Sequence, residues 1–139
     1  MIGNLDELRT KSEIALNAME EHAERIGTDG AAVVLFAPAE GTGDSYSALR
    51  VIGARNVIYE DQTGYNFIAL AYSKIAESLE TERDSGTLTR PLITGEFGYQ
   101  GSAIAKDENG IIVTAFSGST GDIDLEIARS GLNSVLSYD

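Results

Sequence analysis

The chain has 139 residues, a length that suits one domain, and we expect a single domain over residues 1–139. Ten Lys and Arg face 22 Asp and Glu, which gives a formal net charge of −12 with no basic cluster. Neither nucleic acid nor an anionic membrane is therefore an expected partner. The chain has no Cys, which excludes disulfides, thiolate chemistry and Cys-based zinc sites.

The start of the chain lacks the pattern of a secretory signal. Asp6, Glu7 and Glu13 stand where such a signal needs a basic end followed by an unbroken apolar stretch. The longest apolar run, residues 31–39, is too short to cross a bilayer. These features predict a cytoplasmic protein.

The first predicted element is an amphipathic helix of about six turns. Asn4 is a good N-cap with Glu7 three residues later, and apolar or small residues then recur with helical spacing as far as Ile26, before Gly27. Residues 31–37 form a β-branched apolar run, which predicts a buried strand. A turn over residues 38–45 leads to a second predicted strand at 46–52.

The middle of the chain is partly ambiguous. Residues 53–64 fit either a strand end or a helix start, and both alternatives stay open. Residues 65–83 carry the spacing of a second amphipathic helix, ended by the sequence Asp-Ser-Gly at 84–86. A loop with Pro91 and two glycines follows over residues 87–98.

The last third predicts a hairpin and a helix. Residues 99–105 and 111–116 are the two strands, and Asp-Glu-Asn-Gly at 107–110 supplies the turn. A loop of small residues at 117–121 precedes a final helix that starts at Asp122. Antiparallel hairpins flanked by helices predict an α+β fold and not a doubly wound parallel sheet.

Two segments carry a family resemblance. Residues 95–132, GEFGYQGSAIAKDENGIIVTAFSGSTGDIDLEIARSGL, resemble the closing part of the GlcG/HbpS-like family, with Gly118 and Gly121 where that family has glycines. Residues 15–41, ALNAMEEHAERIGTDGAAVVLFAPAEG, resemble its first helix and strand. The turn at 37–41 departs from the family, which commonly has an acidic residue followed by glycines there.

The resemblance implies both a fold and a set of partners. The fold is profilin-like, with an antiparallel sheet of four to five strands and about three flanking helices. Members of the family frequently form homo-oligomers, and several bind haem or are associated with haem degradation. Relatives are encoded with glycolate or diol metabolism. A haem or another small-molecule ligand is therefore the expected partner.

Four residues form the candidate cofactor-binding set: His22, Tyr72, Phe97 and Tyr99. His22 is the only histidine, and it shares a helix face with Met19 and Ile26. It is either an axial ligand of haem iron or a helix histidine packed at the edge of the core or at an interface. The tyrosines, which include Tyr65, could supply a phenolate ligand, although half-buried packing is the more common role.

The acidic helix start favours capping over ligand binding. The loop at 117–121 could bind an anion through free backbone N–H groups, but Asp122 and Asp124 already fill the first turn of the helix. Together with Glu126, these residues are expected to form a solvated acidic face, because the pattern of an EF-hand is missing. The metal content stays unassigned.

The sequence predicts no catalytic residues, because it contains neither a phosphate-binding glycine motif nor a nucleophile elbow. The leading hypothesis is a small ligand-binding protein that holds a planar apolar ligand, haem first, beside the first helix. The alternative is a non-catalytic oligomeric accessory subunit of a small-metabolite pathway that handles glycolate or a diol. An enzyme acting on a small metabolite is a third hypothesis, which requires a pocket with a residue of shifted pKa.

Overall fold

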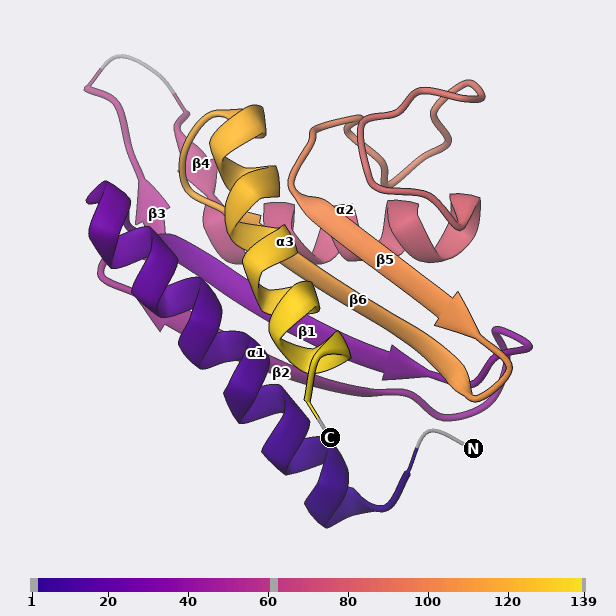
Figure 1. The fold of residues 1–139 in the computed structure, drawn as a ribbon. Coiled ribbons are helices and arrows are strands. Elements are labelled where there is room, and N and C mark those ends of the chain that lie inside the picture. The colour runs from indigo at the N-terminus through magenta and orange to yellow at the C-terminus, as the bar shows by residue number, and fades with distance from the viewer. Residues whose placement is uncertain (1–2, 61–62, 139) are drawn as a thin grey trace.

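The computed structural model of the protein describes residues 3–60 and 63–138. It contains three helices, a four-stranded sheet and a short two-stranded hairpin (Figure 1). The elements in chain order are α1 (Leu5–Ile26), β1 (Gly30–Ala37), β2 (Tyr46–Ile52), β3 (Asn56–Val57), β4 (Tyr65–Asn66), α2 (Phe67–Thr81), β5 (Ser102–Asp107), β6 (Gly110–Ser117) and α3 (Gly121–Leu136).

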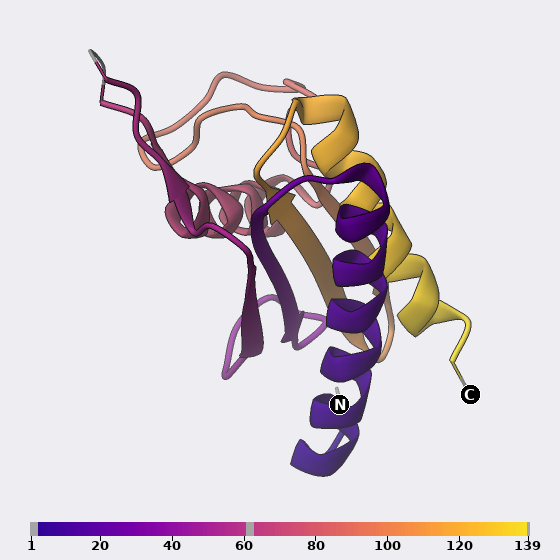
Figure 2. The ribbon, with the colours of Figure 1, turned by 90° about the vertical axis from the view of Figure 1, so that its left-hand side faces the viewer.

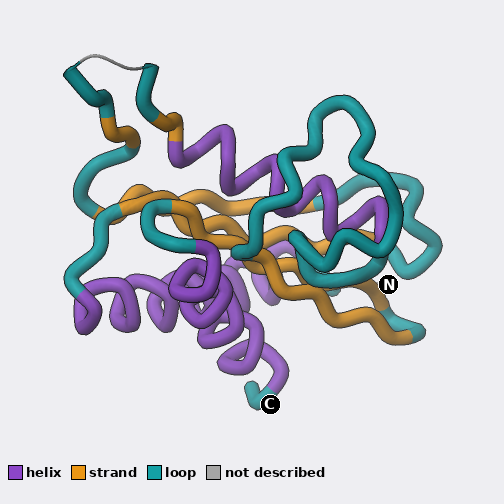
Figure 3. The backbone as a smooth tube through the Cα atoms, turned by 90° about the horizontal axis from the view of Figure 1, so that it is seen from above, coloured by secondary structure: helices purple, strands orange, loops and turns teal. Residues whose placement is uncertain are grey.

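The main sheet has the strand order β2-β1-β6-β5, and every neighbouring pair is antiparallel. Helices α1 and α3 cover one face and α2 covers the other, so the sheet is the middle layer of three (Figures 2 and 3). The α+β class and the antiparallel sheet expected from the sequence are confirmed. The hairpin β5–β6 packs against α3, as its Thr114 hydroxyl donates a hydrogen bond to the carbonyl of Ala128 at 2.6 Å.

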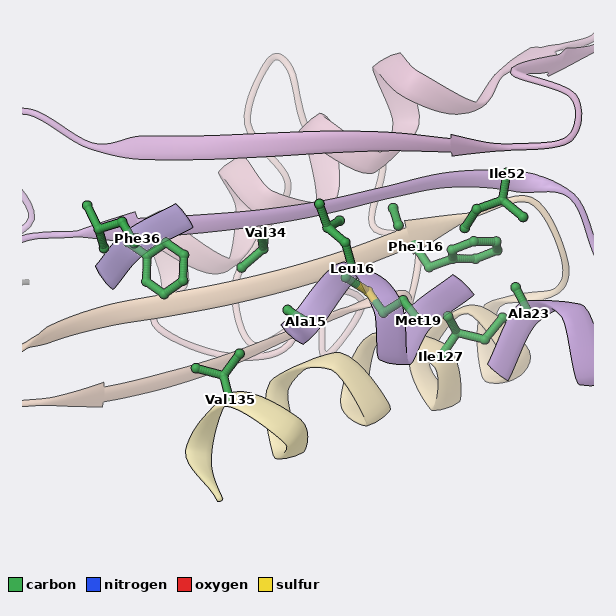
Figure 4. Packing of buried hydrophobic residues seen from close by; sticks show 12 residues of the cluster. Ala15, Leu16, Met19, Ala23, Val34, Phe36, Ile52, Phe116, Ile127 and Val135 are labelled. Atoms are coloured by element: carbon green, nitrogen blue, oxygen red, sulfur yellow. The ribbon is translucent and has the colours of Figure 1, made fainter. Parts of the chain in front are cut away.

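The core between the sheet and the helices α1 and α3 is built from aliphatic side chains and two phenylalanines. Met19 of α1 and Ile127 of α3 meet over Phe116 of β6, and all three are fully buried (Figure 4). Gly131 lets the two helices approach closely, because a Cβ atom at that position would lie 2.7 Å from Cγ of Met19. The close packing of α1 on α3 therefore depends on the absence of a side chain at Gly131, where Met19 fills the space.

The central strand β1 is buried along its whole length because both of its faces are covered. Its residues Val33 and Leu35 pack with Ile75 of α2, and the alternate residues face α1. The edge strand β2 is covered only on the α1 face. Leu49 and Val51 on its other face are 40% and 38% exposed.

Local sequence signals set the helix ends. The Asn4 side chain accepts a hydrogen bond from the Glu7 backbone at 2.9 Å, and Gly27 ends α1 in the left-handed conformation. Asn66 caps α2 in the same way, through the backbone N–H of Ala69. Helix α2 therefore starts at Phe67 and not at Tyr65 as the periodicity predicted, because Tyr65 and Asn66 pair with β3.

Within the ambiguous stretch at 53–64, residues 56 and 57 form the first arm of this hairpin. Asn56 pairs with Asn66, and Val57 pairs with Tyr65. The residues Asp61 and Gln62 lie outside the described residues. In the described part of the chain, none of the helices has the length and apolar character needed to cross a membrane.

Candidate ligand-binding site

A cleft of about 640 Å³ opens at the end of the sheet where β6 meets α3. Its size falls within the roughly 300–1,000 Å³ typical of small-molecule sites. It is bounded by the hairpin β3–β4, the first half of α2, the segment before β5 and the loop of residues 117–121 before α3, here called the glycine loop. The lining residues are Val57, Tyr59, Tyr65, Phe67, Leu70, Lys74, Gly98, Tyr99, Gln100, Ser117, Gly118, Ser119, Thr120, Gly121 and Asp124.

Aromatic side chains from three segments surround this cleft. Tyr59 and Tyr65 of the short hairpin stand edge to face, with ring centroids 6.2 Å apart. Tyr99 stacks on Phe97 at 5.8 Å with an interplanar angle of 12°. The residues Tyr65, Tyr99 and Phe97 are about half exposed, at 48%, 46% and 54%. Exposed aromatic faces beside a cleft can stack on a planar apolar ligand.

The face that α2 turns to the cleft follows helical spacing. Phe67, Leu70 and Lys74 are three and four residues apart and therefore share one side of the helix. Lys74 lies at the inner end of this row, and its side chain is only 3% exposed. The result is a cleft with an aromatic mouth and a charged group at its floor.

Lys74 and Asp124 form a buried ion pair at this floor. The Lys74 ammonium donates hydrogen bonds to Oδ2 of Asp124 and to the carbonyl of Phe116, both at 2.9 Å. The side chain of Asp124 is 4% exposed. Burial lowers the pKa of Lys74 and raises the pKa of Asp124, and their mutual attraction opposes both shifts.

The glycine loop at 117–121 is shaped by the same carboxylate. Oδ1 of Asp124 accepts a hydrogen bond from the backbone N–H of Ser119 at 2.9 Å. This bond fixes the loop before the helix, and the capping role expected of the acidic helix start stays a prediction, because the N-cap residue Thr120 has no side-chain capping hydrogen bond. The expectation of a solvated acidic face is wrong for this residue, because its carboxylate points inward to Lys74, whereas Asp122 is exposed.

A close approach of two backbones fixes where the loop lies. A Cβ atom on Gly118 would lie 2.0 Å from the carbonyl oxygen of Asp29, and one on Gly30 would lie 2.2 Å from that of Ser117. Only glycine fits at both positions. The loop is therefore held against the start of β1, with its backbone facing the cleft.

The segment that carries Phe97 and Tyr99 is held by two acidic side chains. Buried Glu77 of α2 accepts hydrogen bonds from the backbone N–H groups of Gly86 at 2.6 Å and Gly98 at 3.2 Å. Glu96 forms a two-pronged ion pair with Arg90, at 2.8 Å on each side. This contact lowers the pKa of Glu96 to about 2.

His22 lies outside the cleft, in a groove of about 520 Å³ between α1 and α3. Its Nε2 is 2.6 Å from Oε2 of Glu126, and its Nδ1 is 3.3 Å from the Arg25 guanidinium. The groove and the cleft share one lining residue, Gln100. The groove is otherwise lined by Asp122, Leu125, Glu126, Arg129, Ser130 and Asn133, a mostly polar set.

The structure brings two of the four candidate residues together. Tyr99 lines the cleft and stacks on Phe97, which does not itself line it, whereas His22 lines the separate groove. Tyr72 lines neither, because it stands on α2 two residues beyond Leu70 and points away from the Leu70 face. The imidazole and the aromatic side chains therefore belong to two different surface sites.

Sequence reasoning missed Tyr59, Lys74 and the inward role of Asp124. For Lys74 a signal existed, because a lone lysine stands between Ala71, Ile75 and Ser78 on the buried face of the helix. Such a lysine requires a partner of opposite charge. In residues 3–60 and 63–138, no three or more His, Cys, Asp or Glu side chains are grouped so that they could hold a metal ion.

Comparison with known proteins gives likeness of fold only. No family model matches the sequence, and no curated protein does. The structure is similar to HbpS, with a TM-score of 0.66 and 19% identity over 93% of this chain and 89% of that one. It is also similar to PduOC in a haem complex, with a TM-score of 0.63 and 15% identity over 96% and 95%.

A third similar structure is the Klebsiella pneumoniae protein ORFY, with a TM-score of 0.64 and 13% identity over 94% of this chain and 90% of that one. All three likenesses span nearly the whole chain. The protein therefore has the fold of HbpS, PduOC and ORFY, which is the GlcG/HbpS-like fold that its glycine-flanked hairpin and last helix predicted.

Proposed function

We propose that this protein binds a small ligand with a planar apolar part in the cleft between the short hairpin, α2 and the glycine loop. The observation that carries the proposal is the gathering of Tyr59, Tyr65 and Tyr99 around one cavity of suitable size. These residues come from two separate parts of the chain. Each is about half exposed, and none belongs to the main core. The cleft therefore replaces the first helix as the proposed ligand position.

Haem is the first ligand to test. One protein of the same fold was crystallised as a haem complex, and the aromatic side chains here would contact the macrocycle. The tyrosine phenols would be the iron ligands within reach, and haem supplies redox and ligand-binding chemistry when bound. Lys74 is already paired with Asp124, so the propionates would have to face solvent at the mouth.

His22 is the alternative iron ligand. Its imidazole lies beside the Arg25 guanidinium in the groove, and the carboxylate of Glu126 that now contacts Nε2 belongs to a side chain that is 61% exposed. An exposed side chain can move away at little cost. The test must therefore separate binding in the cleft from binding in the groove.

The test is a titration with haemin followed by the Soret band, on the wild type and three variants. Tyr99→Ala removes an aromatic face of the cleft, and Tyr72→Ala is its control on the far side of α2. We expect Tyr99→Ala to weaken binding roughly 2- to 10-fold, because an aromatic pair contributes roughly 0.5–1.5 kcal/mol. Tyr72→Ala and His22→Ala should bind as the wild type does.

Two outcomes contradict the proposal in different ways. If the wild type gives no Soret shift, haem is not the ligand. If His22→Ala loses the shift while Tyr99→Ala keeps it, haem binds in the groove and the cleft is not its site.

The second candidate function is an accessory subunit in a homo-oligomer. The segment between α2 and β5 exposes Leu88, Leu92, Ile93 and Phe97, at 62%, 44%, 52% and 54%. Exposed apolar patches of this kind mark contacts with other proteins. Size-exclusion chromatography with light scattering tests it: a stable oligomer that binds no haemin supports the accessory role, and a monomer at micromolar concentration contradicts it.

A further inference from the structure

The three lysines of the chain lie in different surroundings. The side chains of Lys11 and Lys106 are 26% and 43% exposed, and each is paired with a glutamate at the surface. The side chain of Lys74 is 3% exposed and lines the cleft. Lys74 is therefore the one lysine of the sequence that a ligand in the cleft would meet.

The surroundings of the Lys74 amine leave it little room and few partners. A Cβ atom on residue 101 would lie 2.5 Å from Nζ, so glycine at this position makes space for the amine. Two contacts are made by Nζ, with Asp124 and with the carbonyl of Phe116. The amine is thus held in one place, next to one carboxylate.

Burial favours the neutral forms of this pair. It lowers the pKa of Lys74 and raises that of Asp124, and each shift acts to move the proton from nitrogen to oxygen. A neutral primary amine is the nucleophile in imine formation, and burial is one way in which proteins activate lysine. An adjacent carboxyl group can carry the protons that such a reaction moves.

We propose that Lys74 forms an imine with a small aldehyde bound in the cleft. The inference rests on the proposed function to the extent that it uses the same cleft as a ligand site. It adds a covalent step and a class of ligand that a haem pocket does not require.

The step balances within this pair and one aldehyde. The Nζ lone pair bonds to the carbonyl carbon, the C=O π pair moves to oxygen, and oxygen takes a proton from the Asp124 carboxyl group. The Asp124 carboxylate then accepts a proton from nitrogen and returns it to the hydroxyl group, and the C–O bond breaks as water leaves. The protonated imine keeps its positive charge and one N–H group next to the Asp124 carboxylate.

The cleft also indicates which aldehydes fit. Tyr65 and Tyr99 offer aromatic faces at its mouth, which favours a flat apolar substituent. Asp124 at the floor and a net charge of −12 disfavour a ligand that brings another carboxylate. An uncharged aromatic aldehyde is therefore the expected class, rather than a keto acid.

The experiment uses benzaldehyde with sodium cyanoborohydride, which reduces an imine to a stable benzylamine. Peptide mapping should place a benzyl group on Lys74, with Lys11, Lys106 and the α-amine of the chain as internal controls. Labelling of Lys11 and Lys106 without Lys74 would overturn the inference. This readout needs no variant and therefore does not depend on whether one folds.

Two variants sharpen the assignment. Lys74→Arg keeps a cation beside Asp124 and should lose the label, while Lys106→Arg should keep it, with both folds checked by circular dichroism. Tyr99→Ala should slow the labelling of Lys74 and Tyr72→Ala should not. Equal labelling of the wild type and folded Lys74→Arg would refute the role of Lys74.

Competition with haemin separates the two proposals. Labelling of Lys74 in a protein that binds no haemin upholds the inference and removes haem as the ligand. Haemin binding to a protein in which Lys74 stays unlabelled upholds haem as the ligand and overturns the inference about Lys74. Protection of Lys74 by haemin supports both, because it places the two ligands in one cleft.

Discussion

The charged residues with structural roles are those whose partners lie far away in the sequence. Lys74 and Asp124 are 50 residues apart, yet their ion pair joins α2, the glycine loop and the first turn of α3. Buried charges of this kind are stable only together, because either one alone would be left without compensation. Their pairing therefore ties the floor of the cleft to the integrity of the fold.

Removing one partner of this pair should be costly. We expect Asp124→Asn to lower the free energy of unfolding by about 3–5 kcal/mol, the range measured when a buried ion pair loses one partner. Asp122→Asn, an exposed residue in the same helical turn, is the matched control and should change the urea midpoint little. Equal midpoints for Asp124→Asn and the wild type would show that the pair adds nothing to stability.

At the scale of elements, the segment between α2 and β5 depends on ionised side chains to keep its shape. Arg90 and the backbone N–H of Ile93 both bind the Glu96 carboxylate. Since Glu77 also binds the backbone N–H of Gly98, Phe97 lies between two anchored positions and Tyr99 directly follows the second. The aromatic mouth of the cleft therefore depends on electrostatics more than on apolar packing.

This dependence predicts a pH effect with a definite sign. The pKa of Glu96 falls from its ordinary value of 4.5 to about 2 on folding, so its contribution to stability is present above pH 4.5 and disappears as the pH approaches 2. Glu96→Gln should thus lower the urea midpoint at pH 7 and lose this effect near pH 2. Glu108→Gln, in the exposed β5–β6 turn, is the control. A Glu96→Gln penalty that is independent of pH would contradict the assignment.

Elements with local signals were predictable from the sequence, and elements set by long-range pairing were not. Helix α1 has its cap at Asn4 and its stop at Gly27, so its bounds follow from neighbouring residues. The hairpin β3–β4 was missed because Tyr65 continues the helical spacing of α2, while its partner Val57 lies in a stretch without clear periodicity. The candidate site was incompletely predicted for the same reason, since Tyr59 and Tyr99 line one cleft only after the chain has folded.

At the scale of the whole molecule, the net charge of −12 lies on a small surface, and the repulsion among these charges destabilises the compact folded state. Some of this charge is locally offset, as where Arg50 of β2 binds both Glu13 and Glu20 of α1. The excess of acidic groups remains, and its mutual repulsion is screened by dissolved salt.

Salt should therefore stabilise the fold. Raising NaCl from about 0.01 M to about 0.15 M shortens the screening length from about 30 Å to about 8 Å. We expect the thermal midpoint measured by circular dichroism to rise over this range. A falling midpoint would mean that surface ion pairs such as Arg50–Glu20 contribute more than the overall repulsion.

The direction of the two outer helices has a practical consequence. Helix α1 begins, and helix α3 ends, at the side of the sheet opposite the short hairpin β3–β4 and the start of α3 (Figure 1). A tether attached near Leu5 or near Leu136 would therefore leave the aromatic mouth directed toward the bulk liquid. Protein immobilised in this way on a biosensor chip can thus present the cleft without obstruction by the support.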